Sequence, residues 1–252
     1  MACPHFNIRI IQRSKGQSAI AAAAYQSGER LHSDYDQSWK HYRGKSGNIE
    51  TAILLPSHVP RRFADRATLW NSVEAAEKRW DAQLARRLVI ALPRELNHET
   101  QMKLLREYCQ KQFVSRGMIA DIALHDKGDG NPHAHVLLTM RAMDENGLFL
   151  PKSRMVYVTD ETGRQIRTAN GNWKCRKENT VDWDDRRYAE VWRQAWADTV
   201  NRYYEEHNIP ARIDLRSYER QGCLETPQCS RRPGRPPAET ARYRNHGWQS
   251  ER

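Results

Sequence analysis

The sequence is poor in cysteine and has no long hydrophobic run. Its five cysteines are scattered and form no Cys-x-x-Cys pair, which excludes a zinc ribbon and argues against a disulfide framework. No apolar stretch approaches the roughly 18 residues that a membrane-spanning helix needs, so no insertion into a membrane is expected. Since no signal peptide is recognisable either, the expected location is a reducing cytoplasm.

Negative charge is also in short supply. The 252 residues include 41 Lys and Arg against 31 Asp and Glu, which gives a formal net charge of +10. Such an excess favours a polyanionic partner, because each phosphate that a cation neutralises releases a counterion. Eight Trp and ten Tyr add flat surfaces on which unpaired bases can stack. Composition alone leaves open a soluble basic protein whose charges only keep it dispersed.

Strand and helix patterns interleave along the chain. The expected strands cover residues 6–11, 50–55, 88–92, 118–125, 133–141 and 211–215, and the expected helices cover residues 18–30, 62–81, 99–116 and 185–208. Residues 32–47 and 144–182 are expected to be polar loops, with a hairpin near Asp160. The strands before and after residue 130 form a hairpin and therefore pair antiparallel. The prediction is an α+β two-layer sandwich, with helices packed on one largely antiparallel sheet.

Three of the ten histidines gather in one short stretch. His133 and His135 are two residues apart, so on an extended strand both imidazoles point to one face. Residues 126–132 are rich in Gly, Asn and Pro, so the chain can reverse there and bring His125 beside the other two. Three neutral nitrogens with open coordination positions suit a catalytic divalent metal. The alternative is a polar loop with exposed histidines.

A divalent metal and a polyanionic partner together suggest phosphodiester chemistry, which needs a nucleophile. Tyr25 is the candidate, because Ala21, Ala22 and Gly28 on its helix face are small and leave room for a sugar–phosphate strand. A covalent phosphotyrosine conserves the bond energy, so that strand joining can follow. The alternative is a tyrosine packed on the sheet by its ring.

Several blocks of the chain closely resemble MobA/MobL-type conjugative relaxases. At the N-terminus these are His5-Phe6, Ser-Lys-Gly-Gln-Ser-Ala at residues 14–19 and Ala-Ala-Ala-Ala-Tyr-Gln-Ser-Gly at residues 21–28. Asn-Pro-His-Ala-His at residues 131–135 resembles the HUH motif of that family, with His125 upstream as its third histidine. Weaker similarities occur at residues 81–86, 91–93, 192–197 and 211–218. The resemblance covers about residues 5–225.

The resemblance implies the HUH-endonuclease fold and the nicking of one DNA strand at a plasmid's transfer origin. By matching, Tyr25 is the nucleophile that becomes linked to the 5′ phosphate, and His125, His133 and His135 hold Mg²⁺ or Mn²⁺. The implied partners are single-stranded DNA at the transfer origin, accessory mobilisation proteins and a coupling protein. A plasmid-encoded protein of the bacterial cytoplasm is implied, and DNA unwinding must come from elsewhere because no helicase motif is visible.

Further residues are expected to support this site. Asp121 lies at an even spacing before His125 on the same strand, so it shares that face and is expected to steady the site, with an exposed strand residue as the alternative. His5, just before the first strand, is expected to be a supporting polar residue, with a structural histidine as the alternative. The loop before the tyrosine helix is expected to hold DNA phosphates through Arg13, Lys15 and Gln17. A solvated basic loop is the alternative there.

The chain departs from the family pattern in two places. Arg87 stands where the family usually has Glu after Ala-Arg, which puts efficient nicking in doubt if that Glu approaches the metal or accepts the tyrosine's proton. The reversed charge favours a DNA phosphate instead and repels the metal. After residue 225 the expected His-x-Gly-Pro-Ala-Ala run is missing; the hypothesis is a frameshift near Gln228, and the alternative is simply a basic Pro-rich tail. We therefore expect a relaxase domain at 1–225 and a basic, Pro-rich, flexible tail at 226–252.

Two other functions share part of these features. A rolling-circle replication initiator uses the same histidine motif and phosphotyrosine chemistry, but its tyrosine usually follows the histidines, whereas Tyr25 precedes them. A non-catalytic origin-binding protein is the alternative that Arg87 and the altered tail favour. Tyr35 and Tyr42 are weaker candidates for the nucleophile because both lie in an expected polar loop.

Overall fold

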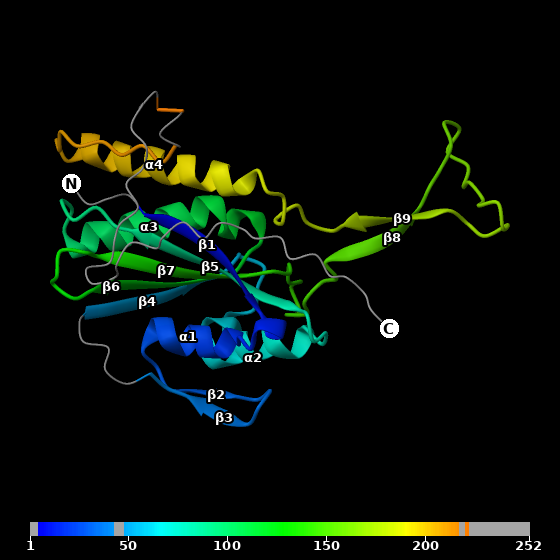
Figure 1. Cartoon of the computed structure of the whole chain (residues 1–252), viewed down its shortest axis with the longest axis horizontal. Helices are drawn as coiled ribbons and strands as arrows, with labels where there is room; N and C mark the ends of the chain where they lie inside the picture. The colour runs from blue at the N-terminus through cyan, green and yellow to red at the C-terminus, as the bar shows by residue number, and fades with distance from the viewer. Residues whose placement is uncertain (1–4, 43–47, 217–219, 222–252) are drawn as a thin grey trace, which may run out of the picture. The chain divides into compact units, whose positions relative to one another are not determined.

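An antiparallel sheet forms the centre of the fold. Its strands are β1 (Phe6–Gln12), β4 (Asn48–Leu54), β5 (Gln83–Ala91), β6 (Ala120–Asp126) and β7 (His133–Thr139). They are ordered β1-β5-β7-β6-β4 in the computed structural model, which describes residues 5–42, 48–216 and 220–221 (Figure 1). β6 and β7 form the predicted hairpin, with His125 opposite His133. The α+β class and the antiparallel sheet are thus confirmed.

Helices cover both faces of this sheet (Figure 1). One face packs against α1 (Ala19–Ser27) and α2 (Arg66–Ala76), and the other against α3 (His98–Gln112) and α4 (Tyr188–Glu206). The sheet is therefore the middle of three layers, where the sequence analysis expected two. The reason lies in the central strands, whose successive residues are apolar on both faces; neighbouring Leu137 and Leu138 are both fully buried.

Local capping decides where the first two helices begin and end. The Ser18 hydroxyl accepts a hydrogen bond from Ala21 N at the start of α1, as predicted. α1 ends before Gly28, whose φ of 76° favours glycine, and so is shorter than expected. The single helix expected at 62–81 is wrong. The Asp65 carboxylate accepts a hydrogen bond from Thr68 N and so caps the start of α2. Asp65 thus separates a 3-10 turn, η2 (Arg61–Ala64), from the shorter α2.

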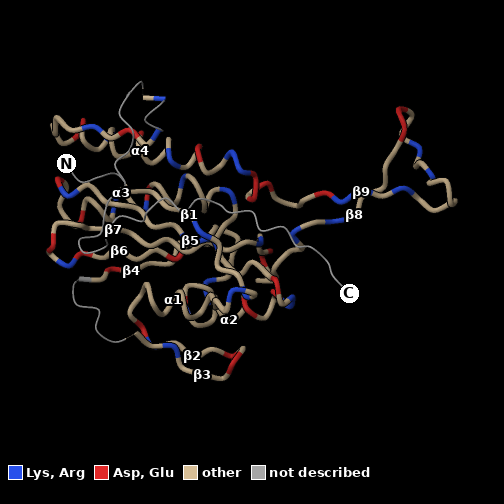
Figure 2. Tube along the Cα trace, viewed as in Figure 1, with Lys and Arg blue, Asp and Glu red and all other residues tan. Residues whose placement is uncertain are grey.

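Two segments expected to be loops contain β-ribbons. β2 (Leu31–Ser33) pairs with β3 (Ser38–Lys40), and β8 (Ser153–Tyr157) pairs with β9 (Cys175–Asn179). The hairpin near Asp160 was predicted, and the Gly163 N–H donates to the Asp160 carbonyl at its turn. β8 and β9 are largely exposed on both faces and carry Lys and Arg (Figure 2). Neither ribbon has the apolar alternation of a half-buried strand.

Residues 211–215 after α4 pair with no strand in the described part of the chain, so the strand expected there is wrong. This segment is held by Asn201 on α4 instead of by a neighbouring strand. The Asn201 side chain hydrogen-bonds both the N–H and the C=O of Ile213. The compact unit runs from Met1 to Leu215, and a second unit covers Arg216 to Arg252. The boundary expected at 225 lies outside the described residues. Within the described part of the chain, no helix is long and apolar enough to cross a membrane.

Glu107 on α3 accepts hydrogen bonds from α4, and the stability that these bonds contribute should depend on pH. Its carboxylate accepts from Lys111, from Arg202 and from the Tyr203 hydroxyl. The Lys111 hydrogen bond and the α4 partners lower the pKa of Glu107 to about 2. A depressed carboxyl pKa stabilises the fold above the unfolded-state pKa and loses that contribution as pH falls through the folded-state value.

We therefore expect Glu107→Gln to lower the free energy of unfolding at pH 6 by about 1 to 2 kcal/mol, allowing for solvent screening of the pair. The difference from wild type should shrink as pH falls from about 4.5 toward about 2, as measured by urea unfolding. A difference that stays constant over this range would contradict the role of Glu107.

Candidate metal and nucleophile site

Three imidazoles converge on the sheet face that α1 covers. His125 lies near the end of β6, His133 and His135 lie at the start of β7, and their ligand atoms are all within 4.8 Å of one another. The ring centroids are 4.6 to 5.4 Å apart. His125 and His135 are buried and His133 is half-buried. The predicted hairpin thus brings the three predicted residues together.

Each imidazole has one nitrogen held by the protein. Nε2 of His125 lies 2.5 Å from the Gln26 carbonyl oxygen, and Nδ1 of His133 lies 3.0 Å from the Asn131 carbonyl oxygen. Nδ1 of His135 lies 3.0 Å from a guanidinium nitrogen of Arg87. A ring N–H bonded to a carbonyl is the arrangement that orients metal-ligating histidines. The donor set therefore fits a divalent cation, with the Arg87 contact as the exception.

Tyr25 lies beside this cluster at the end of α1. Its ring centroid is 6.0 Å from that of His135, and the two rings meet edge to face. The side chain is 39% exposed, so solvent and a substrate can reach the phenol. Tyr42 packs edge-on against the same ring, with centroids 5.4 Å apart. The structure thus brings the predicted nucleophile to the predicted metal ligands.

Gln26, the residue after Tyr25, fastens α1 to the metal-ligand strand. Its side-chain amide donates to the Asp121 carbonyl at 3.0 Å, and its own carbonyl contacts His125. Gln26 is buried, and so is part of the polar framework under the site. Sequence reasoning missed it, because its partners lie far along the chain and only its position next to Tyr25 could have drawn attention.

Arg87 extends from β5 onto the same face. Its guanidinium carbon lies 5.2 Å from the centre of the Tyr25 ring, and it contacts His135. Burial lowers the pKa of Arg87, and the nearby Tyr25 opposes that shift. Its Nε is buried and has no hydrogen-bond partner among the residues that the structure describes. Arg86 points to the opposite face and pairs with Asp184 at 2.7 Å, as the strand alternation requires.

Asp121 shares the face of His125 as predicted, but its carboxylate contacts other residues. Arg66 donates to both carboxylate oxygens at 2.9 Å, and the Trp70 indole N–H adds a third bond at 2.9 Å. Burial raises the pKa of Asp121, and these donors act against that rise. The Asp121 carboxylate therefore fastens α2 to the sheet. The Asp121 backbone carbonyl supports the site by accepting the hydrogen bond from Gln26.

The remaining predicted residues are spread around the site. His5 is exposed, and its carbonyl accepts from Ala91 N, which places it on the same sheet face two strands from His133. Lys15 is exposed on η1 (Arg13–Lys15). Gln17 is turned toward the end of β1, where its side-chain oxygen accepts from Gln12 N at 2.9 Å.

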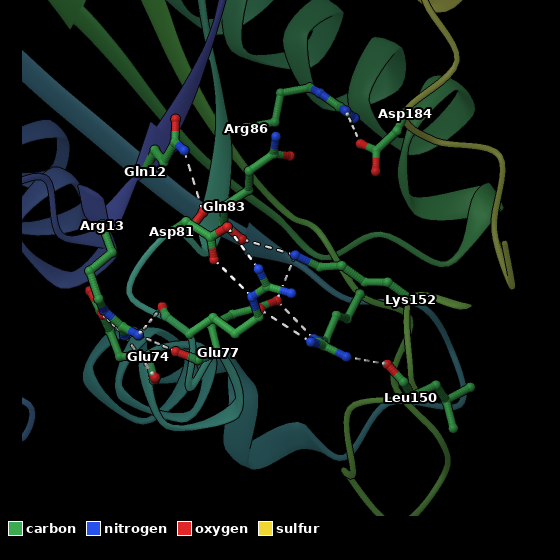
Figure 3. A network of polar contacts seen from close by, with 12 residues as sticks. Gln12, Arg13, Glu74, Glu77, Asp81, Gln83, Arg86, Leu150, Lys152 and Asp184 are labelled. Atoms are coloured by element: carbon green, nitrogen blue, oxygen red, sulfur yellow. Dashed lines mark hydrogen bonds and ion pairs between the residues drawn. The ribbon is translucent and has the colours of Figure 1, made fainter. Parts of the chain in front are cut away.

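Arg13, predicted to hold phosphate, is instead a structural residue. Its side chain is 10% exposed and pairs with Glu74 at 2.9 Å, and it also donates to backbone carbonyls near the end of α2 (Figure 3). Glu74 additionally accepts from Ala19 N at 2.6 Å, which fixes the start of α1. The positive charge of Arg13 is therefore matched inside the protein.

A second carboxylate continues this network at the end of α2. Glu77 pairs with Arg141 at 2.7 Å and with Lys152 at 2.8 Å, two residues on either side of the loop before β8. Figure 3 shows Lys152 reaching into this network from the chain that leads to the ribbon. Burial raises the pKa of Glu77, but the hydrogen bonds from both cations outweigh it and the pKa lies below its ordinary value.

We expect Glu74→Ala to lower the free energy of unfolding by about 3 to 5 kcal/mol, because it leaves the Arg13 charge buried without its carboxylate. It also removes the acceptor for Ala19 N. Chemical denaturation measures the loss, and Glu145→Ala, which removes an exposed loop carboxylate, should change stability by no more than about 0.5 kcal/mol. Equal effects of the two substitutions would refute the anchoring role.

Comparison with known proteins gives the same assignment as the motifs. A sequence model of the MobA/MobL family matches residues 17–233. The chain is 36% identical over 234 residues to the "Conjugal transfer protein TraA" of Agrobacterium fabrum, covering 88% of this chain and 20% of that protein. It is 33% identical over 238 residues to the "Probable mobilization protein MobA" of Bifidobacterium longum, covering 88% and 42%. The chain thus spans about a fifth of the first relative and less than half of the second.

A solved structure has the same fold. It is described as "Molecular Basis of Vancomycin Resistance Transfer in Staphylococcus aureus", with a TM-score of 0.72 and 30% sequence identity. The match covers 86% of this chain and 100% of that one. The family model covers most of the sequence, including Tyr25 and the three histidines, and so the chain belongs to the MobA/MobL family.

Proposed function

We propose that this protein is a metal-dependent relaxase that nicks one DNA strand at a plasmid transfer origin. The nick leaves a 5′-phosphotyrosine on Tyr25, and the reaction starts conjugative mobilisation. The observation that carries the proposal is the 6.0 Å between the Tyr25 and His135 ring centroids, since His135 belongs to the three-histidine cluster. A phenol next to a metal-ligand set is the pairing that tyrosine transesterification needs.

His125, His133 and His135 are the residues that would hold Mg²⁺ or Mn²⁺. When bound, the ion supplies Lewis-acid polarisation of a non-bridging phosphate oxygen and neutralises negative charge on the phosphorus. The protein's part is to orient the rings. The Gln26 and Asn131 carbonyls do this for His125 and His133, so the nitrogen on the opposite side of each ring is the one for the metal.

The transesterification exchanges one phosphate ester bond for another. The Tyr25 oxygen bonds to phosphorus, the bond from phosphorus to the 3′ oxygen breaks, and the 3′ oxygen leaves as a hydroxyl after taking up a proton. The phenol must first lose its own proton, which solvent can accept because Tyr25 is 39% exposed. The guanidinium carbon of Arg87 lies 5.2 Å from the centre of the Tyr25 ring, so a positive charge stands beside the position of the scissile phosphate.

The helix that carries Tyr25 is fixed at both ends. Glu74 holds the first N–H of α1, and Gln26 fastens its last turn to β6. Because α1 is only nine residues long, the two anchors leave the phenol little freedom relative to the histidines. Such preorganisation lowers the barrier by keeping the reacting groups close.

The proposed partner is single-stranded DNA at the transfer origin, approached in the cytoplasm with accessory mobilisation proteins and a coupling protein. Family membership and the position of Tyr25 before the histidines weigh against a rolling-circle replication initiator. Arg87 is the observation that favours a non-catalytic origin-binding protein. It donates to Nδ1 of His135, so a neutral ring carries its proton on Nε2, where a metal would have to replace it.

The test of the enzyme is a covalent adduct with an oligonucleotide from the transfer origin. With Mn²⁺ present, wild type should form a protein–DNA adduct that survives denaturing electrophoresis, and mass spectrometry should map it to Tyr25. Tyr25→Phe should abolish the adduct because the nucleophilic oxygen is gone. Tyr42→Phe is the matched control and should retain it, since the second ring stays in place. DNA binding without any adduct would favour the origin-binding alternative.

We expect Arg87→Glu to raise cleavage at limiting Mn²⁺ by about 10-fold, the usual scale for residues that orient a metal ligand. The substitution removes a cation from His135 and supplies an acceptor for its ring N–H. Initial rates of oligonucleotide cleavage and Mn²⁺ affinity by calorimetry measure the effect.

Arg106→Glu is the control for this change, because Arg106 is exposed on α3, which packs against the opposite face of the sheet. A surface charge reversal should alter the Mn²⁺ affinity by no more than about threefold. Unchanged or lower cleavage by Arg87→Glu would count against a repulsive role for Arg87.

A further inference from the structure

Two exposed aromatic side chains lie on strand β3 and just after it. Trp39 is 57% exposed and Tyr42 is 40% exposed. The guanidinium carbon of Arg30 lies 4.4 Å from the centre of the Trp39 ring. We refer to Arg30, Trp39 and Tyr42 as the aromatic strip. An exposed indole paired with a cation offers a flat, positively flanked surface on which a base can stack.

The hairpin under the strip is firmly anchored. Leu31 is buried in the core, and Asn71 on α2 bonds both the Asp34 N–H and the His32 carbonyl. The His32 ring meets the Trp39 ring edge to face, with centroids 5.1 Å apart. The indole is therefore held in one place, so little side-chain entropy is lost when a ligand stacks on it.

The strip is continuous with the proposed catalytic site. Tyr42 contacts Tyr25 edge to face, with ring centroids 5.4 Å apart. Trp39 precedes Tyr42 by three residues, so their Cα atoms are at most about 10 Å apart. A single strand whose phosphate reaches Tyr25 would therefore have neighbouring bases within reach of the strip.

We propose that the aromatic strip stacks unpaired bases of the DNA strand next to the phosphate that Tyr25 attacks. The proposal rests on the proposed function. Only unpaired bases expose the faces that can stack on an indole or a phenol, so the strip selects single-stranded DNA. Arg30 provides positive charge for the backbone beside those bases. The acidic Asp34 and Asp36 lie in the hairpin turn, and Lys40 pairs with Asp36.

Base stacking is tested by comparing two probes with the same number of phosphates. One probe is oligo(dT) of about 20 nucleotides, which is longer than the stretch that one single-strand-binding domain usually covers. The other probe is an abasic oligonucleotide of equal length. Binding is measured by fluorescence anisotropy with EDTA present, so that no strand is cut. Trp39→Ala should bind oligo(dT) at least about fivefold more weakly than wild type and the abasic probe equally well. Trp39→Phe, which keeps a ring, should recover most of the affinity.

Two substitutions serve as matched controls. Trp80→Ala removes an indole that is 74% exposed between α2 and β5, and Tyr35→Ala removes an exposed ring from the same hairpin, next to Arg13. Neither should change the preference for oligo(dT) over the abasic probe. The proposal is overturned if Trp39→Ala keeps wild-type affinity, or if it weakens binding of both probes equally. The Tyr25 adduct assay is independent of this comparison. Absence of base stacking on the strip and absence of strand cleavage by Tyr25 therefore give different results.

Discussion

The hydrogen bonds of Gln26 are the contacts on which the arrangement of the site depends. The carbonyl of this residue contacts His125, and its side chain donates to the Asp121 carbonyl. Tyr25 precedes it directly, so a shift of the last turn of α1 away from β6 would separate the phenol from the imidazoles. Asp121 in turn is held by Arg66 and Trp70 of α2, so the position of α1 depends on that of α2. The site is thus assembled by packing of helices on the sheet.

The strand period of two determines which residues meet at the site. His125, His133, His135 and Arg87 all point to the α1 face, and a one-residue slip in register would turn a whole strand's set to the other face. The histidine hairpin could be predicted because its strands are close in sequence and joined by turn formers. The contact between Arg87 and His135 could not, because it depends on pairing β5 with β7, which lies more than forty residues away.

The errors in the sequence analysis have a common physical origin. The β2–β3 hairpin and the β8–β9 ribbon carry polar or exposed residues on both faces, so neither has the alternating pattern by which a half-buried strand is recognised. Arg13 was assigned to phosphate because its local sequence is basic. Its partner Glu74 lies on another element, and only the tertiary fold shows that this charge is already matched. Local patterns therefore predicted the half-buried strands and the helices, whereas the exposed ribbons and the partners of charged residues required the structure.

Arg87 controls the charge balance of the proposed site. Its positive charge lies beside the Tyr25 ring and contacts His135, so it repels a divalent ion held there. At equal distance a double charge is repelled twice as strongly as a single one, whatever the local dielectric constant. The site alone therefore has an excess of positive charge once a metal enters. On the proposed function, the scissile phosphate supplies the missing negative charge, whereas Arg87 Nε has no acceptor among the described residues. On the proposed function, DNA completes the charge balance of the site, so strand binding and metal binding reinforce each other.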